Sequence, residues 1–155
     1  MSNLNEMLKK ELIFTDVEAS NSEEMIKILS SKMKGKGFVK DSYCQAVIDR
    51  EKVFPTGLDT GEVKVSIPHT NPEHVNEAAI LVATLKNPVK VNKMEDPASE
   101  MEANIVFMLA VKDPGQQVGT LGKLMSLFCK PEVLKKIYDS KSPEEIYSLI
   151  LENVE

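Results

Sequence analysis

The side chains of this sequence best suited to chemistry are one histidine and one arginine. His69 lies in the segment SIPHT, directly after a predicted strand, and Pro68 stiffens the backbone that presents it. A neutral imidazole is a nucleophile near physiological pH, and strand ends commonly carry functional groups in α/β proteins. Arg50, the only arginine, offers a planar fork that grips phosphate or carboxylate at two points. Taken alone, these residue types are also typical of a surface histidine without a role and of an exposed salt bridge between Arg50 and Asp49 or a neighbouring acid.

A third candidate lies at the beginning of a predicted helix, in the segment DPGQQVGTL. Gly115, Gln116 and Gln117 would occupy its first turn, where free N–H groups can bind an anion. The Gln117 amide can donate a hydrogen bond without carrying a charge. The alternative interpretation is an ordinary polar helix cap.

Metal binding is an alternative for the two histidines, with weaker support. His69 and His74 are five residues apart, a spacing that suits neither one face of a helix nor one face of a strand. Cys44 and Cys129 are remote, and a zinc site needs more ligands at better spacing. The sequence has no nucleotide-binding glycine loop, nucleophile-elbow serine, zinc-protease motif or calcium loop, so we expect no cofactor.

Length, charge and hydropathy limit the class of protein. The 155 residues suit a single domain, residues 1–155, with 42% hydrophobic and 28% charged side chains. The net charge of −5 argues against a general nucleic-acid binder. Two distant cysteines predict a reducing, cytoplasmic compartment. The longest apolar run, Ile105–Val111, is far shorter than the roughly 20 residues that span a bilayer.

The hydrophobic period changes twice along the chain, from helical to strand-like and back. This order predicts an α/β fold: a small mixed β-sheet flanked by helices on both faces, an α/β sandwich. The predicted helices are 3–11, 20–35, 41–52, 131–137 and 142–154, and one more that begins in the segment DPGQQVGTL and reaches Phe128. The predicted strands are 12–17, 63–67, 78–85 and 103–111, with a loop at 55–63 and turns at Asn87-Pro88 and Asp96-Pro97. The helix that begins in DPGQQVGTL is expected to bury Val118, Leu121, Leu124, Met125 and Phe128.

Four segments in order, DREKVFPTG, VSIPHTNPEHV, IVFMLAVKDP and QQVGTLGKLM, resemble a known family. This is the enzyme IIA component of the sugar phosphotransferase system, of the fructose–mannitol type. The most specific part is an Arg-Glu pair, a Thr-Gly pair and then Ile-Pro-His. The details IPHTNPEHV, KNPVKVNKMEDP and VKDPGQQV are most similar to the galactitol-specific branch. Gln117 stands where mannitol and fructose relatives usually place a histidine.

The resemblance implies a phosphocarrier. His69 would accept a phosphoryl group from the histidine phosphocarrier protein HPr and pass it to a cysteine of a IIB component. A sugar alcohol such as galactitol would be phosphorylated later, during its transport through a membrane IIC component. Arg50 would stabilise the phosphoryl oxygens, and Gln117 would donate a hydrogen bond. The alternative is a regulatory IIA-like module, in which phosphorylation of His69 controls a partner protein.

The resemblance also leads us to expect two features around the site. Because two proteins would dock there in turn, we expect an apolar rim formed by Phe54, Leu58 and Val75. A hydroxyl from Ser66 or Thr70 is expected to orient the His69 ring.

Overall fold

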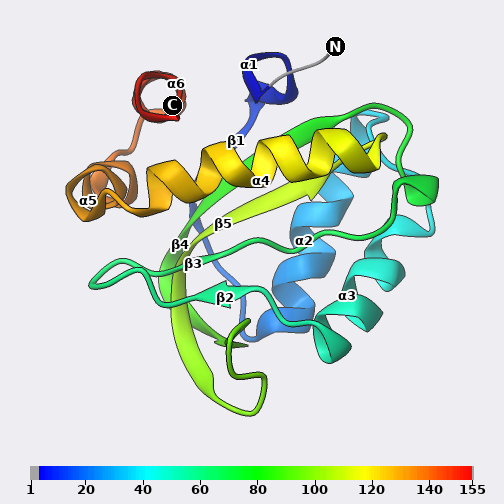
Figure 1. Ribbon diagram of the computed structural model, residues 1–155, viewed down its shortest axis with the longest axis horizontal. Coiled ribbons are helices and arrows are strands. Elements are labelled where there is room, and N and C mark those ends of the chain that lie inside the picture. The colour runs from blue at the N-terminus through cyan, green and yellow to red at the C-terminus, as the bar shows by residue number, and fades with distance from the viewer. Residues whose placement is uncertain (1–3, 155) are drawn as a thin grey trace.

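The computed structural model describes residues 4–154, apart from the side chains of Pro114, Gln116 and Gln117. A short helix and a strand come first, two helices and the remaining strands follow, and three helices end the chain (Figure 1). The elements are α1 Leu4–Met7, β1 Leu8–Val17, α2 Ser22–Gly35, α3 Tyr43–Val53, β2 Gly57–Leu58, β3 Val65–Ser66, the 3-10 turn η1 Pro72–His74, β4 Ala79–Asn92, β5 Glu100–Ala110, α4 Pro114–Phe128, α5 Pro131–Asp139 and α6 Pro143–Asn153.

The described strands form one five-stranded mixed sheet in the order β1-β4-β5-β3-β2. β1 is parallel to β4, β3 is parallel to β5, and the β4–β5 and β2–β3 pairs are antiparallel. The long, nearly continuous apolar runs of β4 and β5 lie at the centre of the sheet, because both faces of a central strand are covered.

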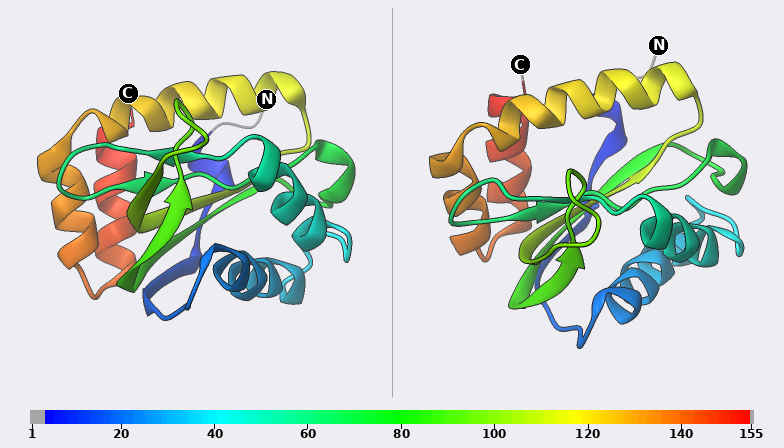
Figure 2. Two further views of the ribbon diagram at one scale, coloured as in Figure 1. Left: turned by 90° about the horizontal axis from the view of Figure 1, so that it is seen from below. Right: turned by 60° about the horizontal axis from the view of Figure 1, so that its bottom comes forward.

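Helices cover both faces of this sheet (Figure 2). Side chains alternate along β4, so Leu81 and Ala83 pack in the core shared with α2 and α3. Ile80 and Val82 pack in the opposite core, shared with α1, α4, α5 and α6. The predicted α/β sandwich is therefore confirmed.

The beginning of the chain differs from the prediction. The expected helix over residues 3–11 ends at Met7, and β1 begins at Leu8. Leu8 pairs with Ile80 of β4, and it is buried. Tertiary pairing with the central strand thus overrides the helical propensity of the segment LKKEL.

The expected turn at Asn87-Pro88 is also wrong, because β4 continues through it to Asn92. The pairing of β4 with β5 shifts register between Thr84 and Val89. A proline lacks the N–H that a ladder needs, and a bulge is where a sheet tolerates it. The turn at Asp96-Pro97 is confirmed, since the β4–β5 hairpin closes there.

A short strand lies inside the expected loop 55–63, because Gly57 approaches its neighbours closely. A Cβ atom at Gly57 would lie 2.6 Å from the carbonyl oxygen of Asn92 and 2.9 Å from a methyl of Val91. The carbonyl of Gly57 accepts the N–H of Met94 at 2.8 Å. Glycine therefore lets the segment after α3 rest against the end of β4.

The buried face of α4 is rotated from the predicted one. Val118 is 74% exposed and Met125 is 44% exposed, although both were expected inside. The side chains that face the core are Thr120, Leu124, Leu127 and Phe128. No helix in the described part of the chain is long and apolar enough to cross a membrane.

Candidate functional site

His69 lies just beyond β3, at the end of the strand. The N–H of Leu109 donates to the carbonyl of Pro68 at 3.0 Å, which extends the pairing of β3 with β5 past the named strand. The side chain of His69 is only 7% exposed. A paired backbone and a buried ring together hold the imidazole in one place.

The environment of the ring keeps His69 neutral and selects its tautomer. The Nδ1 atom lies 2.7 Å from the carbonyl oxygen of Ile67, and a carbonyl can only accept. The contact therefore favours a proton on Nδ1 and a free lone pair on Nε2. Burial lowers the pKa of His69, and the positive charge of Arg50 lowers it further, against the effect of the Ile67 hydrogen bond.

Arg50 lies in the last turn of α3, close enough for its charge to affect His69. Its guanidinium carbon lies 5.3 Å from the centre of the Phe54 ring, and its Nε atom is buried without a hydrogen-bond partner among the described residues. The expected alternative, a salt bridge to Asp49, does not form; Asp49 accepts a hydrogen bond from Gln45 instead. A buried donor without a partner is costly, and a bound anion would satisfy it.

Glu51 and Thr56 are part of the site that the sequence prediction missed. The Glu51 carboxylate accepts the N–H and the hydroxyl of Thr56, both at 2.9 Å. The N–H of Ile67 in turn donates to the Thr56 hydroxyl at 3.2 Å. Both residues stood in the Arg-Glu and Thr-Gly pairs of the resemblance, but spacing alone assigned them no role.

A main-chain carbonyl takes the place of the hydroxyl that was expected to orient the ring. Ser66 is fully buried, and its Oγ lies 3.3 Å from the Oγ1 of Thr56 rather than against His69. Thr70 is buried as well. The ring of His69 is held instead by the carbonyl of Ile67.

The second histidine belongs to a different set of contacts. Nδ1 of His74 lies 2.8 Å from the hydroxyl of Ser42, and its Nε2 lies 4.0 Å from the Glu73 carboxylate. In the described residues, no group of three or more histidine, cysteine, aspartate or glutamate side chains could hold a metal ion. The geometry therefore gives no support to a shared metal site for His69 and His74.

Gln117 lies in α4, and its side chain is outside the described residues. The beginning of α4 is capped by Asp113, whose carboxylate accepts the N–H of Gly115 at 2.9 Å. One of the helix-start N–H groups expected to bind an anion is thus already bonded within the chain.

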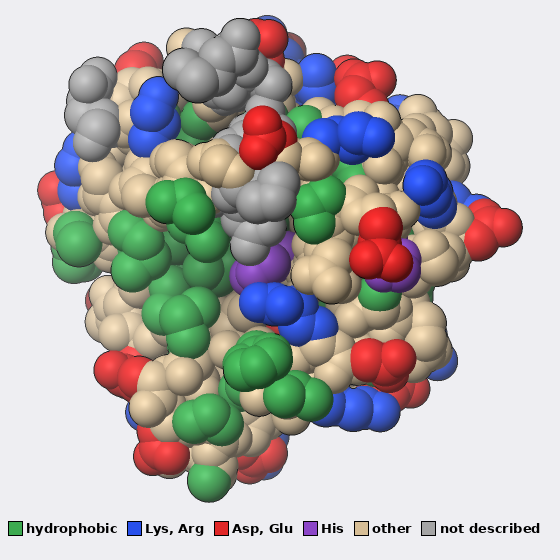
Figure 3. Space-filling model, turned by 45° about the vertical axis from the view of Figure 1, so that its right-hand side comes forward, with side chains coloured by type: hydrophobic (Ala, Val, Ile, Leu, Met, Phe, Trp, Pro, Cys, Tyr) green, Lys and Arg blue, Asp and Glu red, His purple; other side chains and the backbone are tan. Residues whose placement is uncertain are grey.

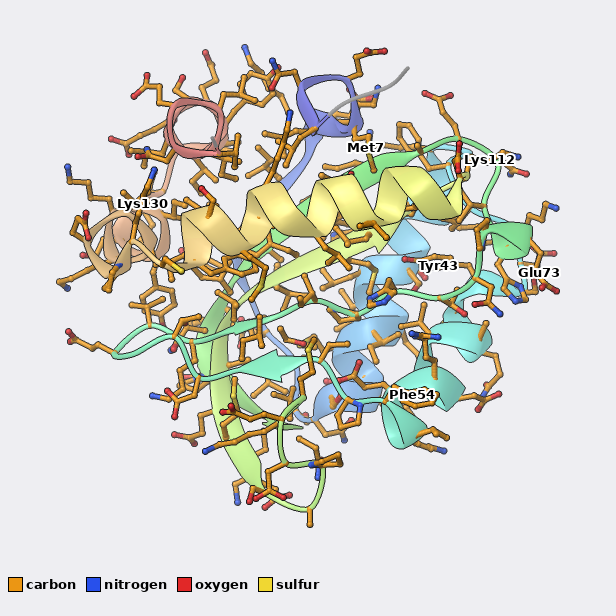
Figure 4. The ribbon with its side chains drawn as sticks, viewed as in Figure 1. Met7, Tyr43, Phe54, Glu73, Lys112 and Lys130 are labelled. Carbon is orange, nitrogen blue, oxygen red and sulfur yellow. The ribbon has the colours of Figure 1, made fainter. Side chains whose placement is uncertain are left out.

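The apolar rim differs from the expected one. Phe54 is 61% exposed as expected, but Val75 is completely buried and Leu58 is only partly exposed. The adjacent Val53 is 64% exposed. Figure 3 shows hydrophobic side chains on the face where histidine side chains reach the surface, beside lysine or arginine. Figure 4 shows Phe54 beside the C-terminal end of α3, on the same side of the molecule as Glu73 and Lys112.

Comparisons with known proteins agree on one family. A sequence model described as phosphoenolpyruvate-dependent sugar phosphotransferase system, EIIA 2, matches residues 6–153. The galactitol-specific EIIA component of Escherichia coli K12 is 29% identical over 114 residues, covering 74% of this chain and 75% of the relative. The mannitol-specific enzyme IIA component of Staphylococcus aureus Mu50 is 29% identical over 143 residues, covering 92% of this chain and 94% of the relative.

A solved structure shows the same fold. Enzyme IIAMtl of Escherichia coli, determined in complex with phosphorylated enzyme IIBMtl, superposes with a TM-score of 0.77 at 24% identity. The match covers 94% of this chain and 99% of that chain. The resemblance drawn from the sequence is thereby confirmed. The chain belongs to the EIIA 2 family of the phosphoenolpyruvate-dependent sugar phosphotransferase system, whose members are phosphotransferases that work through a phosphohistidine.

Proposed function

We propose that this protein is a cytoplasmic phosphocarrier whose phosphoryl acceptor is Nε2 of His69. It takes the phosphoryl group from HPr and passes it to a cysteine of a IIB component, for uptake of a sugar alcohol such as galactitol through a membrane IIC component. The observation that carries the proposal is the contact of His69 Nδ1 with the Ile67 carbonyl, 2.7 Å long, which leaves Nε2 as the free nucleophile.

The first transfer needs no group beyond the two proteins. Nε2 of His69 attacks the phosphorus of the donor phosphohistidine as the donor's N–P bond breaks. The electron pair of that bond returns to the donor imidazole. The Nδ1 proton stays on the ring and keeps its hydrogen bond to Ile67, so the phosphorylated ring is positive beside negative phosphoryl oxygens. In the second transfer a IIB thiolate attacks the same phosphorus, and the electron pair returns to Nε2.

Arg50 stabilises the charge on the moving phosphoryl group. Phosphoryl transfer depends mainly on in-line alignment of the attacking and leaving atoms and on stabilisation of the negative charge on the equatorial oxygens. The Nε atom of Arg50 is buried and has no hydrogen-bond partner in the part of the chain that the structure describes, so it is a donor already free of solvent, and the guanidinium is near His69. No metal or nucleotide is required, since the donor is itself phosphorylated. Gln117 is proposed as a further donor from α4.

The partners are proposed from the relatives and from the exposed apolar side chains. The mannitol relative of known structure forms a complex with phosphorylated IIB. Val53 and Phe54 expose apolar surface at the end of the helix that carries Arg50. Such a surface suits two partners that dock in turn and must also be released. We propose that the chain, residues 1–155, acts as one IIA domain and binds no nucleic acid.

The test is reconstitution of phosphoryl transfer. The protein is incubated with phosphoenolpyruvate, enzyme I and HPr, and its intact mass is measured beside His69→Ala and His74→Ala. We expect one acid-labile phosphoryl group in the wild type and in His74→Ala, and none in His69→Ala. Phosphorylation retained by folded His69→Ala would overturn the assignment. Candidate IIB proteins are then added, and failure of every one to take the group would favour the regulatory module instead.

A further inference from the structure

Glu51 places a carboxylate at the junction of α3 with the strand that carries His69. It follows Arg50 in the last turn of α3, where a carboxylate normally faces water. Here it accepts two hydrogen bonds from Thr56, which is only 3% exposed. Burial raises the pKa of Glu51, against the effect of those two bonds and of Arg50. Partial burial of the Glu51 carboxylate costs free energy, and a helix at the surface can fold without that cost.

Thr56 carries this constraint to the backbone before His69. The N–H of Ile67 donates to both oxygens of Thr56, to the carbonyl at 3.3 Å and to the hydroxyl at 3.2 Å. The carbonyl of Ile67 then accepts the Nδ1 proton of His69. Glu51 is thus connected to the imidazole by three successive contacts, through Thr56 and Ile67.

We propose that Glu51 is a positioning residue for His69 and Arg50: through Thr56 it fixes the Ile67 carbonyl that orients the ring and sets its tautomer. The kinetic part of this inference rests on the proposed function. The same bonds hold the segment after α3 against β3, so the guanidinium of Arg50 and the imidazole of His69 keep one mutual position.

The direction of each hydrogen bond explains why a carboxylate is needed. The Thr56 hydroxyl has one proton, which goes to Glu51, so its lone pairs are left to accept the Ile67 N–H. A glutamine at position 51 would have the same shape, but its amide N–H₂ would donate to the Thr56 oxygen. The Thr56 oxygen would then accept from the glutamine as well as from Ile67, and its proton would turn toward Ser66. Thr56 would lose the charge-assisted bond to residue 51 that holds its hydroxyl in place to accept from Ile67.

The chain offers a matched control for charge. Asp49 is an exposed carboxylate on the same helix, also next to Arg50, and it accepts a hydrogen bond from Gln45. Asp49→Asn removes one negative charge beside Arg50 without touching Thr56. Glu51→Gln removes one charge and also replaces one of the two oxygens that accept from Thr56 with an N–H₂ donor. The difference between the two variants isolates the positioning contribution from simple electrostatics.

The experiment measures two quantities for Glu51→Gln, Thr56→Val, Thr56→Ser and Asp49→Asn. The first is the rate of phosphoryl transfer from phosphorylated HPr at saturating donor. The second is the ¹⁵N shift of each His69 ring nitrogen by NMR, with His74 as an internal reference. We expect Glu51→Gln and Thr56→Val to slow transfer about tenfold or more and to shift the ring from the Nδ1–H form to a tautomer mixture. Thr56→Ser retains most of the rate, and Asp49→Asn stays within about a factor of two.

Three results would overturn the inference. Glu51→Gln could transfer at the wild-type rate with an unchanged ring, Asp49→Asn could lose as much rate as Glu51→Gln, or wild-type His69 could carry its proton on Nε2. If Glu51→Gln does not fold, Thr56→Val decides on the same two readouts, because it leaves the carboxylate in place. If the wild type accepts no phosphoryl group, the proposed function fails, while the ring tautomer in the variants still decides whether Glu51 positions His69.

Discussion

Nδ1 of His69 lies 2.7 Å from the main-chain carbonyl oxygen of Ile67, two residues earlier in the chain. This bond directs the other ring nitrogen, Nε2, to be the unprotonated one. The carbonyl itself is held by a paired backbone, since Ile67 donates to Thr56 and Leu109 donates to Pro68. A local turn at a strand end therefore determines which ring nitrogen of His69 keeps a free lone pair.

The first prediction concerns pH. Because burial and Arg50 lower the pKa of His69 below its ordinary value of 6.5, the ring stays neutral in mildly acid solution. Phosphoryl acceptance should persist as pH falls through 6.5 and decline only at the lower pKa of the folded protein. An NMR titration of His69 measures that midpoint directly, and a midpoint at or above 6.5 would contradict the prediction. Arg50→Gln should raise the midpoint by less than the shift due to burial, because burial is the larger cause.

The stability of the fold should also depend on the titration of His69, and it should decrease as the pH falls. The unfolded chain, with an ordinary histidine pKa, takes up the proton first as pH falls. The free energy of unfolding contributed by His69 is therefore fully present above pH 6.5 and decreases as pH falls toward the folded pKa. Urea denaturation of the wild type and His69→Gln at several pH values gives the difference. A difference that grows in favour of the wild type on acidification would be the wrong sign.

Arg50→Lys should slow phosphoryl transfer by about tenfold or more, although the charge is kept. A lysine has no planar fork and no Nε donor at the buried position that Arg50 now fills. Stopped-flow transfer from phosphorylated HPr measures the loss. Lys52→Ala removes a neighbouring exposed charge and serves as the control. Equal rates for wild type and Arg50→Lys would show that the fork and the Nε donor of Arg50 do not contribute to transfer.

Phe54→Ala should weaken docking more than folding. The ring is 61% exposed and lies 5.3 Å from the guanidinium carbon of Arg50, a contact of the kind that contributes about 0.5–1 kcal/mol at exposed sites. We expect the KM for phosphorylated HPr to rise several-fold while the melting temperature changes by only a few degrees. Met94→Ala, 43% exposed on the β4–β5 hairpin, is the matched control. The prediction fails if both variants change KM alike.

Gly57→Ala should destabilise the fold by about 1–3 kcal/mol, because the new methyl would overlap the carbonyl of Asn92. Gly122→Ala in α4 meets nothing within 4 Å and should be neutral or stabilising by about 0.5–1 kcal/mol. Urea unfolding of both variants checks the pair. Similar effects at the two positions would show that the close approach at Gly57 is not what selects glycine there.

Much of the candidate site could be predicted from local sequence. Pro68 before His69 and the single arginine in its helix led to the two candidate residues, and the order of the motifs predicted the family. Helices α2 and α6 were also predictable, because Asn21 and Ser142 cap them through contacts three residues away. These contacts join residues that are close in the sequence, so they can be predicted without knowledge of the tertiary structure.

Local patterns in the sequence were enough to predict most of the helices, the buried central strands, and His69 with Arg50 as a candidate reactive pair. The folding of the chain decided that Val118 and Met125 of α4 face outward, that β4 runs through Pro88, and that Val75 is buried. It also decided the connection from Glu51 through Thr56 to the His69 ring. The physical reason is that the end of α3 and the end of β3 meet only after the strands pair. A hydrogen bond between two such segments leaves no periodic pattern or fixed spacing in the sequence, so the sequence does not predict it.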